Sequence, residues 1–302
     1  MKSTLKKIAR HALTRLKWIW IDLADLFYIN PRDFSWKVRW RMKNDRNPLY
    51  VELQDKYKVK AYAHKKSVQT ADVYFVTDNP ETIPFDSLPE KYFIKANHGS
   101  GWNILFEDGQ FFNYVNGENL VSRDLSKSVI NRDECVELCK IWLRTPYSKR
   151  QWAYGQIKPL IYIEEKVEPY EGTALIDYRC FVFNGVVRVI NQDSPDYDMH
   201  TNVFVDPSWK PFDLPGHTET PPTPFPKNPS RFSDIVKTAE TLGNGFDFVR
   251  VDLFDTTKGI LLSEMTIYPE GGNLNTPTSC SKFNKWLAEQ WTLPIVRKAI
   301  FS

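Results

Sequence analysis

A strand pattern runs through Arg250-Val251-Asp252-Leu253-Phe254, and Glu264-Met265-Thr266-Ile267-Tyr268-Pro269 follows ten residues later. Apolar residues interrupted by one Asp are typical of a buried strand, and Gly259–Glu264 is typical of its hairpin partner. Such a hairpin would place Asp252 and Glu264 side by side. Buried carboxylates are costly unless a cation holds them together, and oxygen-only ligation suits Mg²⁺, which commonly enters a site bound to nucleotide phosphates. The two residues are therefore candidate Mg²⁺ ligands.

Length and composition indicate a globular protein with a substantial core. The chain has 302 residues, of which 14% are aromatic and only 13 are glycine, so it is not a disordered protein. Its four cysteines show neither a CxxC pattern nor a Cys/His metal spacing, and Cys135 and Cys139 would share one helix face. No signal-peptide pattern and no membrane-spanning apolar run is evident, so we expect a cytoplasmic protein with reduced thiols.

Positive charge is concentrated at the N-terminus. Residues 1–46 contain 12 Lys or Arg against 4 Asp or Glu, whereas the remainder contains 28 against 33. Apolar residues recur at helical spacing through 5–27, with the basic residues mostly off that stripe. An amphipathic helix packed on its own domain is the commoner explanation. The alternative is peripheral contact of residues 3–29 with the anionic inner face of a membrane, with Trp18 and Trp20 near the headgroups. No aromatic and basic platform is evident, so we expect no nucleic-acid partner.

Strand and turn patterns dominate the chain after residue 90. We expect strands at 73–76, 92–96, 103–106, 110–113, 160–167, 175–183, 186–192, 248–254 and 260–266. We expect helices at 33–46, 49–63, 131–143, 230–242 and 281–289. Three prolines between 80 and 89 indicate an interdomain connection, and six prolines in 214–229 predict an extended surface loop. This order of elements predicts an α+β fold with mostly antiparallel sheet.

A lysine and a glycine-bearing turn follow the strand at 92–96. Lys95 lies at the end of this strand, and the turn is His98-Gly99-Ser100-Gly101. Successive backbone N–H groups in such a turn can face a phosphate while the lysine supplies a point charge. The segment is not a P-loop, because no GK[ST] follows at the required spacing.

Three more segments of the chain contain charged residues in patterns that suggest a binding site. The segment 55–60 has the pattern DKxxxK, which is also typical of a solvated helix face. The strand at 160–167 contains two adjacent acids, and its main chain can offer hydrogen bonds to an adenine edge. In the next strand, alternation sets Asp177 and Arg179 on one face.

In this order, the motifs resemble those of an ATP-grasp ligase, and the chain is most similar to the TupA-like (teichuronopeptide-biosynthesis) branch found in surface-polysaccharide operons. The resemblance covers most of the chain, from about Asn47 to Pro294. It implies two α+β subdomains whose mostly antiparallel sheets sandwich ATP, after a helical N-terminal region. The expected divisions are a basic region 1–46, a linking subdomain 47–90 and an ATP-grasp domain 91–302, whose ATP-binding and catalytic subdomains are about 91–167 and about 168–302.

The resemblance also implies roles for individual residues. Lys60 and Lys95 would hold the ATP phosphates, and Glu164 and Glu165 would form the adenine hinge. The loop from Asn97 to Asn103, which contains His98, Gly99, Ser100 and Gly101, would be a mobile flap over the phosphates. Asp177 would bind the ribose hydroxyls, and Glu168 and Glu171 are the alternatives for this role.

The same resemblance implies that Asp252 and Glu264 bind Mg²⁺. Arg250 would face the transferring phosphoryl group, and Arg179 would point toward the γ-phosphate or the acceptor. Many relatives have Asn where this chain has Thr266, which would weaken a second Mg²⁺ site.

The implied activity is that of an ADP-forming carboxylate–amine ligase. ATP would convert a carboxylate into an acyl phosphate, which an amine then attacks, so no protein nucleophile is needed, and neither GxSxG nor a Cys/His pair is evident. Expected substrates are an amine and a uronic-acid carboxyl of a capsular or cell-wall glycan, or a polyglutamate-like chain. Their pocket would be built by 1–90 and by the loops of 194–229.

A glycosyltransferase is the competing hypothesis. Asp196 and Asp198 form a DxD pattern after a strand, which in many such enzymes binds a metal and a sugar nucleotide. The pattern is short, and this hypothesis leaves Lys95, the paired acids and the hairpin carboxylates unexplained.

Overall fold

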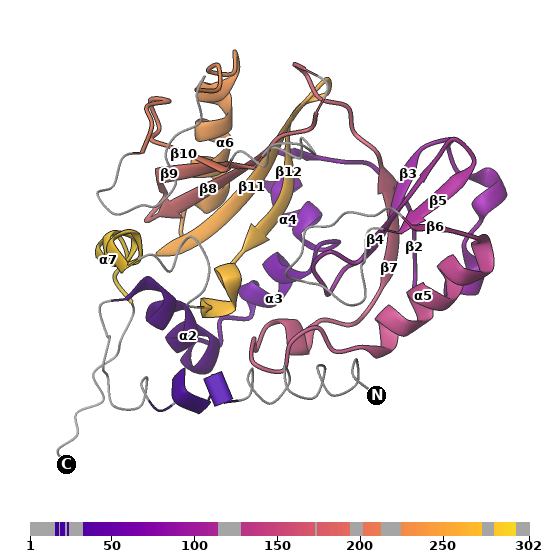
Figure 1. The fold of residues 1–302 in the computed structure, drawn as a ribbon, viewed down its shortest axis with the longest axis horizontal. Coiled ribbons are helices and arrows are strands. Elements are labelled where there is room, and N and C mark those ends of the chain that lie inside the picture. Colours follow the sequence, from indigo (N-terminus) through magenta and orange to yellow (C-terminus); the bar gives the residue numbers. More distant parts are fainter. Residues whose placement is uncertain are drawn as a thin grey trace, which may run out of the picture.

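The described part of the chain is built around two six-stranded sheets (Figure 1). The structure is a computed structural model, and it describes residues 16–17, 19–21, 23, 33–113, 128–172, 174–193, 202–212, 225–273 and 281–293. Sheet A has the order β1-β12-β11-β8-β9-β10, and sheet B has the order β2-β7-β3-β4-β5-β6. Among the described strands only β1 and β12 pair in parallel, so the expected α+β fold with mostly antiparallel sheets is confirmed.

Sheet B is built from consecutive segments of the chain. Its strands are β2 (Val73–Thr77), β3 (Tyr92–Ala96), β4 (Asn103–Glu107), β5 (Gln110–Asn113), β6 (Ser128–Ile130) and β7 (Ile161–Glu165). Side chains alternate along β3, because Tyr92, Ile94 and Ala96 are buried in one core while Phe93 and Lys95 occupy the opposite face. The helix α5 (Arg132–Arg144) contributes Cys135 and Cys139 to that core as free thiols.

Sheet A combines one short N-terminal strand with five later ones. Its strands are β1 (Gln69–Thr70), β8 (Asp177–Phe183), β9 (Val186–Asp193), β10 (Asn202–Val205), β11 (Phe248–Thr256) and β12 (Gly259–Thr266). The helix α6 (Phe232–Gly243) packs on β8, β9 and β11, whereas α7 (Ser281–Glu289) packs on α2 (Phe34–Asn44). The strands of sheet A and these helices share one large core.

Two expectations about the connections were wrong. The helix expected over 49–63 is split into α3 (Leu49–Gln54) and α4 (Val59–Lys65), because the Asp55 carboxylate accepts hydrogen bonds from the backbone N–H groups of Tyr57 (3.0 Å) and Lys58 (3.1 Å). The proline-rich segment at 80–89 does not link domains. It forms the short 3₁₀ helices η1 (Pro80–Thr82) and η2 (Phe85–Ser87) between two strands of sheet B.

The helices α3 and α4 lie between the two sheets (Figure 1). Both pack against β12 of sheet A, and Tyr57, in the turn that joins them, contacts Tyr162 of β7 with 6.2 Å between ring centroids. The turn between α3 and α4 therefore reaches both sheets.

Among the described residues, the structure contains no helix that is long and apolar enough to span a membrane. The described residues between 16 and 23 are helical, and Ile21 is buried there while Leu16, Ile19, Trp20 and Leu23 are exposed. The proline-rich stretch at 213–224 lies outside the described residues.

Candidate active site

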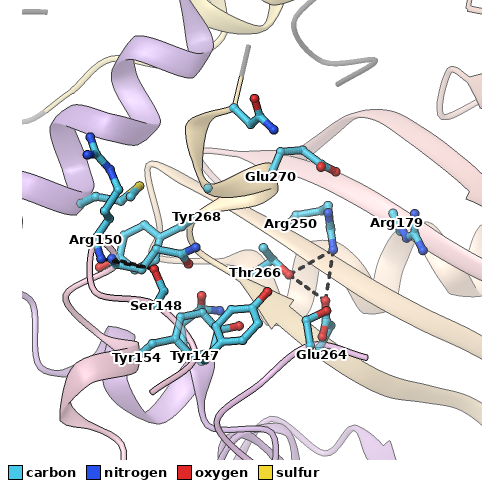
Figure 2. A pocket seen from close by; sticks show the side chains of 16 residues that line it. Tyr147, Ser148, Arg150, Tyr154, Arg179, Arg250, Glu264, Thr266, Tyr268 and Glu270 are labelled. Atoms are coloured by element: carbon cyan, nitrogen blue, oxygen red, sulfur yellow. Dashed lines mark hydrogen bonds and ion pairs between the residues drawn. The ribbon is translucent and has the colours of Figure 1, made fainter. Parts of the chain in front are cut away.

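Three charged side chains form a row across the middle strands of sheet A. In the strand register, Asp252 of β11 is opposite both Arg179 of β8 and Glu264 of β12. Arg250, two residues from Asp252 and on the same face, donates to both carboxylate oxygens of Asp252 at 2.8 and 2.6 Å. Arg250 also donates to Glu264 Oε1 at 3.1 Å (Figure 2). The hairpin thus brings the two candidate metal ligands together under one guanidinium.

The facing strands of sheet B hold a second charged group. Glu164 of β7 accepts hydrogen bonds from Lys95 Nζ at 2.5 Å and forms an ion pair with Lys60 Nζ at 2.8 Å. Burial alone would raise the pKa of the Glu164 carboxyl, but the two ammonium groups outweigh burial and lower this pKa to about 2. The two lysines expected to hold phosphates therefore converge on one carboxylate.

Lys56 connects the two groups, and sequence reasoning did not single it out. It lies in the turn between α3 and α4, and its ammonium forms an ion pair with Glu264. Burial, followed by repulsion from the Lys95 ammonium, lowers the pKa of Lys56 to about 8. Its electrostatic partners include Asp252 and Arg250 from sheet A and Glu164 from sheet B. The DKxxxK pattern was the available signal, but it did not show that Lys56 enters the space between the sheets as well as Lys60.

Arg179 is held by acids on both sides. Its guanidinium contacts Asp177 at 2.8 Å and Asp193 at 2.7 Å. Burial raises the pKa of Asp177 to about 6, against the lowering effect of Arg179. The expected ribose ligand is thus an acid engaged with a neighbouring arginine in this conformation.

The glycine-bearing turn lies against α5. His98 is buried, with Nδ1 within 3.1 Å of Asn97 Oδ1 and Nε2 within 3.1 Å of the Trp142 carbonyl oxygen. Both ring nitrogens therefore have partners inside the protein, and the expected contact of His98 with ATP would have to replace one of them. The Trp102 ring packs over Gly99, where an added Cβ would come within 2.4 Å of it, so glycine is required at this close approach. Of the other turn residues, Ser100 lines the cavity described below, and Gly101 adopts a positive φ.

Glu165 is the last residue of β7. Its carboxylate pairs with Lys258 Nζ at 2.7 Å, and its backbone N–H donates to the Asp72 carbonyl oxygen. The side chain therefore turns toward the hairpin end of sheet A, while the preceding Glu164 faces the lysines.

A cavity of about 430 Å³ adjoins the row of charges on sheet A. Figure 2 shows Arg250, Thr266 and Glu264 on one side of it and Arg150 on the opposite side. Its walls come from η4 (Pro269–Gly272), from α2 and α3, and from a segment before β7 whose lining residues are Tyr147, Ser148, Arg150, Gln151 and Tyr154. From the sequence we expected the substrate pocket to be built by residues 1–90 and by the loops of 194–229. Met42 and Gln54 do come from the first region, but no described residue of the second lines this cavity.

The oxygen ligands present fit Mg²⁺. Asp252 and Glu264 are cross-strand neighbours, and the Thr266 hydroxyl donates to Glu264 Oε1 at 3.0 Å. Hard oxygen ligands of this kind are typical of Mg²⁺ sites that are completed by phosphate oxygens and water. In the described ranges no group of three His, Cys, Asp or Glu residues is placed to hold a metal ion, so the candidate set here is the pair Asp252 and Glu264. The competing DxD pair, Asp196 and Asp198, lies outside the described residues.

Comparisons with known proteins found one matching family model and several solved structures of low identity. A family model described as TupA-like ATPgrasp matches residues 36–292. D-alanine–D-alanine ligase from Bacillus anthracis, complexed with ATP, is 12% identical with a TM-score of 0.41, over 80% of this chain and 63% of that one. The ATP-grasp ligase PsnB, solved with Mg and ADP, is 13% identical with a TM-score of 0.40, over 80% and 60%. A RiPP-associated ATP-grasp ligase from Chryseobacterium gregarium, solved with ADP and peptide, is 16% identical with a TM-score of 0.39, over 82% and 63%.

The matched part spans less than two thirds of each of these three proteins. A search of curated proteins found no match.

Proposed function

This chain belongs to the TupA-like ATP-grasp family, and we propose that it joins a carboxylate to an amine with ATP and Mg²⁺, releasing ADP and phosphate. One observation supports this proposal more than any other. Lys60 of α4 and Lys95 of sheet B face the same space as Arg250, Asp252 and Glu264 of sheet A, and Lys56 bridges the two sets. A nucleotide triphosphate bound with Mg²⁺ is the chemistry that such a set of groups can hold.

We assign sheet B to ATP binding and sheet A to catalysis. On this assignment Lys60, Lys95 and Lys56 bind phosphate oxygens, and Asp252 and Glu264 hold the metal. ATP phosphates would replace Glu164 as the partner of the two lysines, because a triphosphate carries more charge than one carboxylate. Bound Mg²⁺ would neutralise phosphate charge during transfer. Positioning and charge stabilisation supply most of the catalysis in phosphoryl transfer, so no protein nucleophile is required.

The cavity of about 430 Å³ is the proposed substrate site. It is lined by three arginines, Arg150, Arg179 and Arg250, and by several tyrosines, among them Tyr147 and Tyr154. Guanidinium groups bind carboxylates in bidentate geometry, and a polar, aromatic wall suits a hydroxylated ring. We therefore propose a uronic-acid carboxyl of a surface or capsular glycan as the substrate, with an amine as acceptor.

We further propose a cytoplasmic enzyme that contacts the inner membrane face through residues 3–29. The support is a helix with one apolar stripe exposed, formed by Leu16, Ile19, Trp20 and Leu23, within a basic N-terminal region. Lys17 Nζ donates to Asn273 Oδ1 at 2.7 Å, and Asn273 lines the substrate cavity. Membrane contact would therefore hold the cavity close to the bilayer surface.

Nucleotide binding tests the reaction class. We expect Mg²⁺–ATP at about 100 times its Kd to stabilise the protein by about 2.7 kcal/mol, which a thermal unfolding experiment detects. UDP-sugars should give no such stabilisation. Stabilisation by UDP-sugars alone would instead favour the glycosyltransferase.

Substitutions of Lys95 and Asp252 test the assigned site. Lys95→Ala and Asp252→Asn should each lower the rate of ADP release by about 100-fold or more, because each removes a charge that faces the phosphates or the metal. Circular dichroism should show the same fold for both variants. The matched control is Lys158→Ala, which removes an exposed lysine paired with Asp78 on the edge of sheet B. Full ADP-forming turnover in either site variant would show that the assignment is wrong.

A further inference from the structure

One acidic side chain of the substrate cavity is left without a partner. Among the described residues that line this cavity, Glu264 and Glu270 are the two that carry a carboxylate. Glu264 is engaged by the Lys56 ammonium and by Arg250. Glu270 is exposed, and within the described part of the chain its carboxylate forms neither an ion pair nor a hydrogen bond. The cavity therefore contains one carboxylate that is available to a ligand.

The backbone at Glu270 has a conformation that glutamate rarely adopts. Its φ of 55° and ψ of 12° lie in the left-handed region, and Gly271 and Gly272 after it also have positive φ values. Glycine adopts this region without strain, and Asn and Asp ease the strain with a short polar side chain, but glutamate does neither. Backbone strain that a structure maintains at one residue is a reason to ask what its side chain does. Here the side chain is a carboxylate in the substrate cavity.

Figure 2 shows where the Glu270 side chain lies. It extends from η4 toward Arg250, and Tyr147 and Tyr154 lie on the other side of the cavity. The Glu270 carboxylate interacts electrostatically with both Arg250 and Tyr147, which agrees with this view. A group held by Glu270 would therefore lie between the charged row of sheet A and the tyrosines.

The tyrosine wall suits a cation. The rings of Tyr147 and Tyr154 pack with their centroids 4.7 Å apart and their planes at 51°. The face of an aromatic ring attracts an ammonium group, and the attraction is stronger where water is excluded. The Arg250 guanidinium already donates to both carboxylate oxygens of Asp252, so its charge is largely offset before Glu270 is considered. A carboxylate opposite aromatic rings favours a positively charged ligand.

We propose that Glu270, Tyr147 and Tyr154 form the binding site for the amine substrate, which enters as a primary ammonium group. This inference rests on the proposed ligase function, and it places the amine beside the row of charges where the acyl phosphate would form. The Glu270 carboxylate accepts hydrogen bonds from the ammonium, and the two rings flank it. The substrate is then an aliphatic amine or an amino sugar that is cationic at neutral pH, and not an amide or an aromatic amine.

Calorimetric titration of the full chain, without nucleotide, tests the proposal with defined probes. Ethanolamine and glucosamine carry an ammonium group, and N-acetylethanolamine and N-acetylglucosamine are their uncharged counterparts. We expect at least one of the two amines to bind about 10-fold or more tightly than its acetylated counterpart, which is the scale of one charge-assisted hydrogen bond. Equal binding within both pairs, or binding of none of the four probes, would overturn the proposal.

Glu270→Gln is the first decisive variant, because it removes the charge and keeps the size of the side chain. It should reduce the preference for the amine to about threefold or less. Glu90→Gln makes the same charge change at an exposed position that does not line the cavity, and it should keep the preference. A preference that survives in Glu270→Gln would show that the ammonium is bound elsewhere.

Glu270→Gly separates a binding role from a structural one. Glycine adopts the backbone conformation of this residue without strain, so this variant should unfold at the same urea concentration as the wild-type protein or at a higher one. It should also lose the preference for the amine. A variant that unfolds at a clearly lower urea concentration would show that the carboxylate supports the fold, which contradicts the proposal.

Stabilisation by Mg²⁺–ATP separates the two levels of inference. Glu270→Gln should be stabilised by Mg²⁺–ATP as the wild-type protein is. A wild-type protein that Mg²⁺–ATP stabilises but that does not prefer the amines would exclude the amine site alone. A wild-type protein that Mg²⁺–ATP does not stabilise would contradict the ligase function itself.

Discussion

The ionisation of Glu164 is controlled by charged side chains from distant segments of the chain. Its buried carboxylate lies between Lys60 of α4 and Lys95 of β3, and both ammonium groups are within 2.8 Å. A buried carboxylate is tolerated at this position because its two cationic partners offset the loss of hydration. In the proposed cycle the same carboxylate holds the two lysines in place before ATP arrives.

The depressed pKa of Glu164 predicts a dependence of stability on pH. Its folded-state pKa of about 2 lies below the ordinary value of 4.5, so its stabilising effect is present above pH 4.5 and is lost as pH falls toward 2. The full effect is about 3 kcal/mol. Urea unfolding between pH 5 and pH 2.5 should therefore show a steeper loss of stability for the wild-type protein than for Glu164→Gln. Parallel curves for the two proteins would contradict this account.

At the scale of elements, the contact between α2 and η4 builds one wall of the substrate cavity. Gly272 has a φ of +66°, and an added Cβ would lie 2.5 Å from Arg39 Cγ and 3.0 Å from the Ser35 carbonyl oxygen. Glu270 and Gly271 before it also have positive φ values, so the backbone turns sharply at this point. Only a residue without a side chain allows α2 to approach so closely.

Gly272→Ala should destabilise the protein by about 2 kcal/mol more than Gly109→Ala, because both changes strain a positive φ but only the first also creates a clash. Gly109, in the turn between β4 and β5, has a φ of +75° and nothing within 4 Å of an added Cβ. Chemical denaturation of the two variants measures this difference. Equal losses would mean that α2 and η4 can separate at no cost.

The helix that precedes α2 carries an apolar stripe whose role can be tested at the same scale. Trp20 is 69% exposed and Leu16 is 62% exposed, although Ile21 on the same helix is buried. We expect the wild-type protein to sediment with vesicles that contain phosphatidylglycerol and not with pure phosphatidylcholine. Combined Leu16→Ser and Trp20→Ser changes should lower the partition coefficient by about 10-fold or more. Tyr74→Ser, a change at an exposed aromatic residue of β2, is the matched control.

Several outcomes of this vesicle experiment would contradict membrane contact. These outcomes are a wild-type protein that remains in solution with both kinds of vesicle and a wild-type protein that binds both kinds equally. Self-association through the stripe would instead appear as a dimer in light scattering that the Leu16→Ser and Trp20→Ser changes abolish.

At the scale of the whole molecule, the two sheets meet through Lys56. Its ammonium pairs with Glu264 of sheet A and lies in the field of Lys95 and Glu164 of sheet B. The turn between α3 and α4 thus delivers one cation to the space that the proposed triphosphate would occupy.

Lys56→Met should remove at least half of the thermal stabilisation that Mg²⁺–ATP provides, because one phosphate-facing cation is lost. The fold without ligand should remain, since Glu264 keeps its ion pair with Arg250 at 3.1 Å. Lys58→Met, an exposed change two residues away, serves as the control. Undiminished ATP stabilisation in Lys56→Met would exclude Lys56 from the nucleotide site.

Local sequence patterns were sufficient for most of the strands and for the pairing of Asp252 with Glu264. β11 and β12 are joined by a short turn, so their pairing as a hairpin follows from neighbouring residues, whereas the register shift between Asp252 and Leu253 does not. The helix α5 was also predictable, because Asn131 and Glu134 form a capping box that marks its start.

Packing between distant segments decided which other side chains lie around the carboxylate pair. That Lys56 enters the space between the sheets together with Lys60 depends on where Asp55 ends a helix and how that turn meets β12. The burial of His98 depends on α5, and the cavity depends on Tyr147, Arg150 and Glu270 coming together. Hydrophobic period and turn chemistry act over a few residues, whereas these placements are set by contacts between segments tens to hundreds of residues apart. The sequence by itself therefore determined the strands and the carboxylate pair, and only the tertiary structure decided which side chains surround them.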